Sequence, residues 1–257
     1  MGLNVGGVHS TAQFPQQTEV VVIGGGIIGV ATALSLVSRG IPTVLVEKGY
    51  IAGEQSSRNW GWCRRTGRDI RELPLINLSM QLWEGMNERL QQDCGFTATG
   101  IAYASRSEQQ LQTHQQWLQE ARQHDIHSEM LSREQLQLKM PGVKGNYFGA
   151  LYTPGDGRAE PQLAAPALAK AACEAGLNLQ QHCAVRVIGS SGGKESEVIN
   201  ERGVIRCGAD VVAGGGWSRL ITQGCGPTLL QLNGLPLVLP TSVTRFAYGV
   251  HCRFSSV

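Results

Sequence analysis

The 257-residue sequence has little charge and no long hydrophobic run. Charged residues make up only 16% of the chain and the net charge is +2, so the charge pattern predicts no nucleic-acid or anionic-membrane partner. No apolar run approaches the roughly 18–20 residues of a transmembrane helix, and we expect no membrane span. Glycine is abundant instead, with 33 residues, which suits an α/β enzyme with many tight turns.

The sequence also lacks the cysteine and histidine spacing of a metal site or a disulfide framework. It has seven cysteines, an odd number, and no C-x-x-C pattern. Two of the six histidines, His124 and His127, are three positions apart, but in a polar stretch that we interpret as surface. We therefore expect reduced thiols, no metal and a cytoplasmic location.

The most informative segment is Thr18–Gly29, in which an apolar, β-branched run ends at Gly24 and further glycines follow at Gly26 and Gly29. In a G-x-G-x-x-G pattern the first glycine permits the turn out of the strand. The second lets a pyrophosphate approach the backbone, and the third lets the next helix pack closely. The N–H groups at the start of that helix face the phosphates. The pattern predicts a dinucleotide site; a chance glycine triplet is the alternative.

The residues after the glycines continue the same unit. Residues 27–38 predict a helix that Gly40 terminates, and 42–47 predict a second buried strand that ends in an acid. Glu47 follows Gly24 by about 23 positions, close to the roughly 20 typical of the carboxylate that binds ribose hydroxyls. Because a carboxylate there repels a 2′-phosphate, Glu47 favours FAD or NAD over NADP.

Periodicity predicts further elements along the chain. Residues 74–94 read as a helix whose apolar stripe comprises Leu75, Leu78, Leu82 and Met86. A strand is predicted over 179–187 and a last apolar strand over 210–213, so the second half can complete the sheet begun at Val20.

With these elements placed, the sequence resembles the FAD-dependent oxidoreductases of the D-amino-acid oxidase superfamily, which includes glycine oxidase, sarcosine oxidase and D-amino-acid dehydrogenases. The resemblance covers roughly residues 18–225. Five ordered pieces carry it: V-V-V-I-G-G-G-I-I-G-V-A-T-A (20–33), V-L-V-E-K (44–48), S-S-R-N-W-G (56–61), G-A-L-Y-T-P-G-D-G-R-A-E-P (149–161) and A-D-V-V-A-G-G-G-W-S (209–218).

The resemblance implies an α/β fold, with a Rossmann-type (glutathione-reductase-like) FAD-binding domain and a partial mixed-sheet substrate domain. It also implies FAD as cofactor, and oxidation of the C–N bond of an amino acid or secondary amine by hydride transfer to the flavin. The implied partner is thus a small-molecule amino acid or amine.

The resemblance implies cofactor contacts at four places and no catalytic residue. The pyrophosphate turn is lined by Gly24, Gly26, Ile27, Ile28 and Gly29, and the adenosine ribose is met by Glu47 and Lys48. The loop of Ser56, Ser57, Arg58, Asn59 and Gly61 wraps the pyrophosphate and approaches the flavin. The adenine edge is held by the backbone of Val185, and the second strand-end turn brings Ala213 and Gly214 close to the cofactor.

An arginine-rich loop follows the predicted cofactor loop and contains Arg64, Arg65, Arg68 and Arg71. One hypothesis is that one of these guanidinium groups holds an anionic group of the substrate; the alternative is ordinary surface solvation. We interpret Cys63 as a plain thiol and Trp217 as a core residue or a wall of the cofactor site.

The domain organisation expected from these segments is discontinuous. It comprises a flexible leader (1–17), an FAD-binding domain (18–94 and 140–225), part of a substrate domain (95–139) and an atypical tail (226–257). The tail lacks the family's final glycine-bearing segment, which predicts a truncation or an altered reading frame after Gly224. Two alternatives to an enzyme of this family stay open: a non-catalytic FAD- or nucleotide-binding fragment or subunit that needs a partner chain, and an NAD-dependent dehydrogenase. Assembly with a partner subunit or as a homo-oligomer stays open as well.

Overall fold

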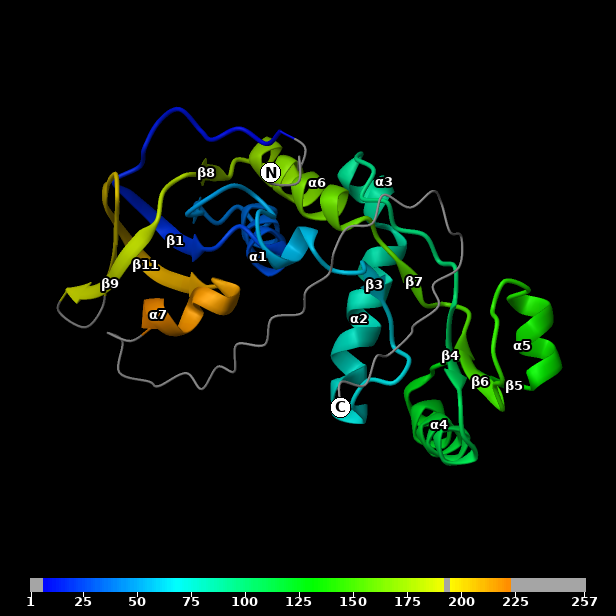
Figure 1. Ribbon diagram of the computed structural model, residues 1–257. Coiled ribbons are helices and arrows are strands. Elements are labelled where there is room, and N and C mark those ends of the chain that lie inside the picture. The colour runs from blue at the N-terminus through cyan, green and yellow to red at the C-terminus, as the bar shows by residue number, and fades with distance from the viewer. Residues whose placement is uncertain (1–6, 192–194, 223–257) are drawn as a thin grey trace. The chain divides into compact units, whose positions relative to one another are not determined.

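The computed structural model describes residues 7–191 and 195–222, which divide by their contacts into two compact units (Figure 1). Among the described residues, the first unit holds 7–60, 87–95 and 160–222, and the second holds 61–86 and 96–159. The tail predicted at 226–257 and the departure after Gly224 lie outside the described residues. No helix in the part of the chain that the structure describes is long and apolar enough to cross a membrane.

The first unit is built on a six-stranded mixed sheet with the strand order β8-β2-β1-β11-β10-β9. Its parallel strands are β1 (Gln17–Ile23), β2 (Thr43–Val46), β8 (Asn178–Gln180) and β11 (Gly203–Val212), and its antiparallel strands are β9 (Val185–Ser191) and β10 (Glu195–Asn200). The last residue of β1, Ile23, pairs with Val46 on one side and with Val212 on the other. Three parallel strands therefore end side by side, at the place where open α/β sheets bind their ligands.

Helices and irregular turns complete the first unit. Helix α1 (Ile27–Val37) packs against α6 (Pro161–Glu174), and the remaining elements are η1 (Gln55–Ser57), α3 (Met86–Leu90), η4 (Gly215–Trp217) and α7 (Ser218–Thr222). The core explains the apolar run of β1: Val21, Val22 and Ile23 are at most 3% exposed, as expected of a central parallel strand covered on both faces.

The second unit is an α+β assembly around a three-stranded antiparallel sheet. The sheet has the order β4-β6-β5, formed by β4 (Ile101–Ser105), β5 (Glu129–Leu131) and β6 (Gly149–Thr153). A separate ribbon pairs β3 (Trp62–Cys63) with β7 (Gly157–Arg158). The helices are η2 (Ile70–Glu72), α2 (Leu73–Glu84), α4 (Glu108–Ala121), η3 (Arg122–His124) and α5 (Arg133–Lys139).

The prediction of which apolar residues the helix over 74–94 buries is wrong. The helix stops at Gly85, and α2 buries Leu73 and Met80 instead. Three predicted stripe residues are exposed, Leu75 at 73%, Leu78 at 54% and Leu82 at 44%. The contacts of Leu73 and Met80, two turns apart, set the rotation of α2 about its axis, and periodicity alone does not specify which apolar residues find a partner.

The strand predicted over 179–187 is also wrong, because the chain leaves the sheet after β8 and re-enters it at β9. At the break, His182 takes a left-handed conformation (φ 51°) and its N–H donates to the Gly49 carbonyl at 2.7 Å. The N–H of Cys183 donates to the Glu47 carbonyl at 2.9 Å. Backbone bonds to the segment after β2 thus replace a straight strand.

Residues 8–16, assigned to the leader from sequence, run beside β8 with hydrogen bonds to its residues. The Thr11 N–H donates to the Leu179 carbonyl at 2.8 Å, and the Asn178 side chain donates to the Gln13 carbonyl at 3.1 Å. The substrate-domain assignment of 95–139 stays a prediction, although the contacts group that range with 61–86 and 140–159.

Candidate dinucleotide-binding site

The turn after β1 requires glycine at Gly24. Its backbone is left-handed (φ 115°), and a Cβ there would lie 2.5 Å from the Ala213 carbonyl oxygen. The Gly24 N–H donates to the Val46 carbonyl at 2.9 Å, so the turn is tied to the end of β2. Gly29 is equally constrained, since a Cβ there would overlap the Gly24 carbonyl oxygen. These two glycines let α1 start directly against the turn.

Gly26 differs from the other two because the protein itself hardly constrains it. Its backbone lies in a region open to any residue (φ −75°, ψ 176°), and among the described residues a Cβ would meet only the Ser56 hydroxyl, at 3.1 Å. The space over Gly26 is therefore open to a ligand. A glycine that the fold does not need, at the start of a helix, fits the close approach of a pyrophosphate.

The start of α1 adds the positive end of the helix dipole. The first turn of α1 holds no acidic residue. The Ile27 N–H donates to the Ser56 Oγ at 2.9 Å, whereas Ile28 is 68% exposed. The helix dipole and the hydroxyl of Ser56 thus favour an anionic group beside this turn.

Glu47, at the end of β2, is fixed by the same turn. Its Oε2 accepts from the Gly25 N–H at 2.6 Å and its Oε1 accepts from the Gly49 N–H at 2.7 Å. A carboxylate has about four lone-pair sites, so both oxygens keep capacity for ribose hydroxyls. The carboxylate therefore both shapes the turn and presents acceptors next to it.

Replacing Glu47 with glutamine is expected to lower FAD affinity about tenfold, because an amide NH₂ would face one of two backbone N–H groups and remove one acceptor. Fluorescence titration of FAD into both proteins measures the change. The control is Glu19→Gln, a change at an exposed acid on β1. Equal FAD affinity of Glu47→Gln and the unaltered protein would contradict this role.

Two cationic residues that are predicted to contact the cofactor, Lys48 and Arg58, both form an ion pair with Glu54. Glu54 lies 2.9 Å from the Lys48 Nζ and 3.4 Å from Arg58, whose guanidinium also donates to the Gly53 carbonyl at 2.9 Å. These side chains are 38–51% exposed, so the ion pairs are weak and a phosphate can compete for the cations.

Other predicted loop residues make local bonds. The hydroxyl of Ser57, which is buried, donates to the Glu54 carbonyl at 3.2 Å, and the Asn59 amide donates to the Gln55 carbonyl at 2.9 Å. Gly61 belongs to the second unit, where its carbonyl accepts from Ala159 at 2.8 Å. Of the predicted loop, the structure brings Ser56 to the glycine turn.

The second strand-end turn lies against the first. The Ala213 N–H donates to the Ile23 carbonyl at 2.8 Å, and a Cβ on Gly24 would come within 3.1 Å of the Gly214 nitrogen. Trp217 is 47% exposed and lies under the Lys48 ammonium at 4.2 Å, so it is not a core residue. Val185 begins β9 and packs against the core of the unit; its adenine contact stays a prediction.

Sequence reasoning missed two contributors to this turn. Gly25 supplies the N–H that fixes Glu47, and the buried Ala52 donates its N–H to the Gly25 carbonyl at 2.9 Å. Ala52 adopts a left-handed conformation (φ 59°), which no local pattern signals. Gly25 occupies the first variable position of the G-x-G-x-x-G motif, so the motif gives no reason to single it out.

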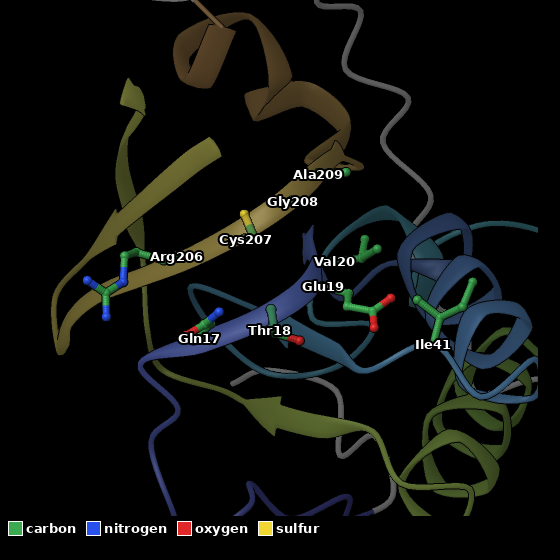
Figure 2. Close-up of a pocket in the computed structure, with 9 residues that line it drawn as sticks. All are labelled: Gln17, Thr18, Glu19, Val20, Ile41, Arg206, Cys207, Gly208 and Ala209. Atoms are coloured by element: carbon green, nitrogen blue, oxygen red, sulfur yellow. The ribbon is translucent and has the colours of Figure 1, made fainter. Parts of the chain in front are cut away.

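A cavity of about 730 Å³ lies elsewhere on the first unit, along the first half of β1 and β11 (Figure 2). Its lining includes Thr18, Val20, Arg206 and Cys207, none of which belongs to the glycine turn. Burial raises the pKa of the Cys207 thiol to about 11, so this thiol stays protonated near neutral pH. The cavity is thus distinct from the glycine turn, which follows the ends of the same strands.

The structure separates the four arginines of the arginine-rich loop, Arg64, Arg65, Arg68 and Arg71. Arg71 pairs with Asp69 at 2.6 Å and Arg68 lies 4.0 Å from Glu72, all of them exposed. Arg65 and Arg64, by contrast, are partly buried.

Arg64 has no ion-pair partner within the described part of the chain. Its guanidinium donates to the Thr66 carbonyl and lies 5.8 Å from the Trp62 ring centroid and 5.5 Å from that of Tyr103. Burial lowers the pKa of Arg64 from its ordinary value, which is the cost of a cation held away from water. The aromatic faces offset part of that cost and leave guanidinium donors for an anion.

A buried carboxylate organises the backbone next to Arg64. Asp156 is fully buried and accepts from the N–H groups of Arg65 and Thr66, each at 2.9 Å, and from the Thr66 hydroxyl at 2.6 Å. The Arg65 guanidinium lies 3.8 Å away. The Thr66 hydroxyl also reaches the Thr153 hydroxyl at 2.6 Å, which ties the loop to β6.

Comparison with known proteins gives consistent matches. The profile of the family described as FAD dependent oxidoreductase (DAO) matches residues 19–252. Sarcosine oxidase subunit beta of an Arthrobacter species is 29% identical over 216 residues, which cover 81% of this chain and 53% of that protein.

Solved structures share the α/β fold, which confirms the predicted fold class. L-Amino acid deaminase from Proteus myxofaciens, in complex with anthranilate, is 33% identical with a TM-score of 0.82, covering 86% of this chain and 50% of that one. Glycine oxidase from Geobacillus kaustophilus is 25% identical with a TM-score of 0.77, covering 83% and 60%. The chain spans about half the length of the curated relatives it matches.

Proposed function

This chain belongs to the FAD-dependent oxidoreductase (DAO) family, and from this premise we propose that it binds FAD and serves in oxidising the C–N bond of an amino acid or amine. The observation that carries the proposal is the open space over Gly26, a glycine that the fold itself does not require. Beside it stand the start of α1 and the Ser56 hydroxyl, which suit a pyrophosphate.

In this proposal, the glycine turn and the side chains next to it bind the cofactor. The pyrophosphate lies on Gly24, Gly26 and Gly29 at the start of α1, with Ser56 and Arg58 as additional donors, and the ribose hydroxyls bond to Glu47. When bound, FAD supplies the hydride acceptor for the substrate carbon beside the amine. The protein orients the cofactor and excludes NADP, because the Glu47 carboxylate repels a 2′-phosphate.

For the substrate, we propose that Arg64 binds an anionic group such as the carboxylate of an amino acid. The hypothesis drawn from the arginine-rich loop thus narrows to one residue, because Arg65, Arg68 and Arg71 lie close to carboxylates of this chain. An amino-acid substrate is also supported by the names of the relatives, glycine oxidase and L-amino acid deaminase.

Replacing Arg64 with methionine is expected to raise the dissociation constant for a carboxylate-bearing substrate about 30-fold, or about 2 kcal/mol, because a charge-assisted pair is lost. The matched control is Arg71→Met, which removes an exposed arginine already paired with Asp69. Calorimetric titration of a panel of amino acids and decarboxylated amines measures the effect. The hypothesis fails if Arg64→Met and Arg71→Met bind the amino acids equally well.

A second candidate is a subunit that binds FAD but needs another chain for activity. It is favoured by the span of the chain, about half the length of its relatives, and by the name of one of them, sarcosine oxidase subunit beta.

We also propose a cytoplasmic location, supported by the absence of any disulfide among the five cysteines of the described part.

The visible spectrum of the purified, FAD-loaded chain separates these functions. An enzyme in its own right is expected to show a flavin band that an amino acid or secondary amine bleaches under anaerobic conditions. A subunit is expected to show the same band, unbleached until a partner chain is added. A protein that retains no flavin would refute both functions.

A further inference from the structure

The segment before β1 is fastened to the edge strand β8 by main-chain and side-chain bonds. Thr11 bonds Leu179 twice: its N–H donates to the Leu179 carbonyl at 2.8 Å, and its hydroxyl accepts from the Leu179 N–H at 3.0 Å. Gln180, which is fully buried, donates to the carbonyls of Thr11 at 3.2 Å and Gln13 at 3.1 Å. The segment thus covers β8 with specific contacts.

Gln181 joins this segment to the loop that follows β2. Its side-chain Nε2 donates to the Val8 carbonyl at 2.7 Å, and its Oε1 accepts from the Ile51 N–H at 2.8 Å. Its own N–H donates to the Ser10 hydroxyl at 3.0 Å. Because one end of the amide meets an acceptor and the other a donor, its orientation is fixed by its partners.

Ile51 and the next residue, Ala52, lie directly against the glycine turn. Both are buried, at 3% and 1% exposed, and a Cβ on Gly25 would come within 2.8 Å of the Ile51 side chain. The Ala52 N–H donates to the Gly25 carbonyl at 2.9 Å. Ala52 is held in a left-handed conformation, which an alanine adopts only where its surroundings enforce it.

We propose that Gln181 is a positioning residue for the dinucleotide turn, and that residues 8–11 hold its amide in place. The chain of contacts runs from Val8 through Gln181 to Ile51, and from Ala52 to Gly25. Gly25 in turn donates to Glu47, the proposed ribose acceptor. The N-terminal segment thereby sets the cofactor affinity of a turn that it does not touch. This inference rests on the proposed binding of FAD.

The test compares Gln181→Ala with Asn178→Ala in the full chain. Gln181→Ala removes both bonds of the bridge, whereas Asn178→Ala removes a bond to Gln13 on the same segment and a bond from Gln180, without touching Ile51. Gln181→Glu is the second variant, since it keeps an acceptor for Ile51 but loses the donor to Val8. FAD affinity is measured by flavin fluorescence, and the exchange rates of the Ile51 and Ala52 amides are measured without FAD.

We expect Gln181→Ala to raise the FAD dissociation constant about three- to tenfold, the size of one net hydrogen bond, and to speed Ile51 and Ala52 exchange about tenfold. Gln181→Glu is expected to give an intermediate change in both. Asn178→Ala is expected to leave both within about twofold, even where it lowers the denaturation midpoint.

Unchanged exchange at Ile51 and Ala52 in Gln181→Ala would overturn the proposal, and so would an equal change in Asn178→Ala. If the unaltered chain binds no FAD, the proposed function is wrong, while the exchange rates still decide whether Gln181 positions the turn.

Discussion

Replacing Gly26 with alanine should weaken FAD binding about 100-fold, or about 2.8 kcal/mol, and leave the fold intact. The added methyl group occupies the space over the turn that a pyrophosphate would need. Within residues 7–191 and 195–222 it meets only the Ser56 hydroxyl, at 3.1 Å, which is the end of a side chain that can rotate. The backbone of Gly26 already has angles that alanine adopts. Fluorescence titration gives the affinity, and thermal unfolding without FAD gives the stability.

Two matched substitutions make this result specific. Gly85→Ala adds a methyl group that meets no other segment of the described chain within 4 Å, and should change neither affinity nor unfolding. Gly29→Ala drives a methyl group into the Gly24 carbonyl oxygen, and should lower stability and affinity together. Unimpaired FAD binding by Gly26→Ala would show that the pyrophosphate does not lie over this glycine.

Replacing Asp156 with alanine should lower the free energy of unfolding of the second unit by about 3 kcal/mol. The substitution leaves the N–H groups of Arg65 and Thr66 without their acceptor and removes a buried carboxylate 3.8 Å from the Arg65 guanidinium. Urea denaturation followed by tryptophan fluorescence measures the loss. Because the same carboxylate fixes the backbone next to Arg64, amino-acid binding should weaken as well.

The exposed pair of Asp69 and Arg71 provides the control for Asp156. Asp69 also accepts from a backbone N–H and from an arginine, but in solvent. The hydrogen bonds from Arg71 lower the pKa of Asp69 to about 2. Asp69→Ala should nevertheless leave stability almost unchanged. Equal losses for the two substitutions would mean that burial of Asp156 adds nothing.

The sequence predicted the cofactor-binding half of the fold well, for local reasons. The order of strand, glycines, helix, strand and acid places Gly24, Gly29 and Glu47 within one βαβ unit, where short-range spacing fixes geometry. The helix of residues 27–38 and the strand of 42–47 are confirmed as α1 and β2. What holds Glu47, however, is the N–H of Gly25, a contact that the motif does not specify.

The predictions that were wrong all depend on contacts between residues that are far apart in the sequence. The exposed face of α2 depends on which residues find partners in the second unit, and the break at 181–184 depends on bonds to Glu47 and Gly49. Four arginines in one loop look alike in sequence. Burial distinguishes Arg64 and Arg65 from Arg68 and Arg71, and the ion pair with Asp156 distinguishes Arg65 from Arg64. Contacts between segments that are 91 or more residues apart leave no local pattern in the sequence.

Binding of FAD at the turn after β1 can be measured by titrating FAD into the purified 257-residue chain while following flavin fluorescence. We expect saturable binding with one FAD per chain, competed by ADP but not by an ADP that carries a 2′-phosphate, because the Glu47 carboxylate repels that group. A fluorescence signal that stays that of free FAD throughout the titration would contradict it.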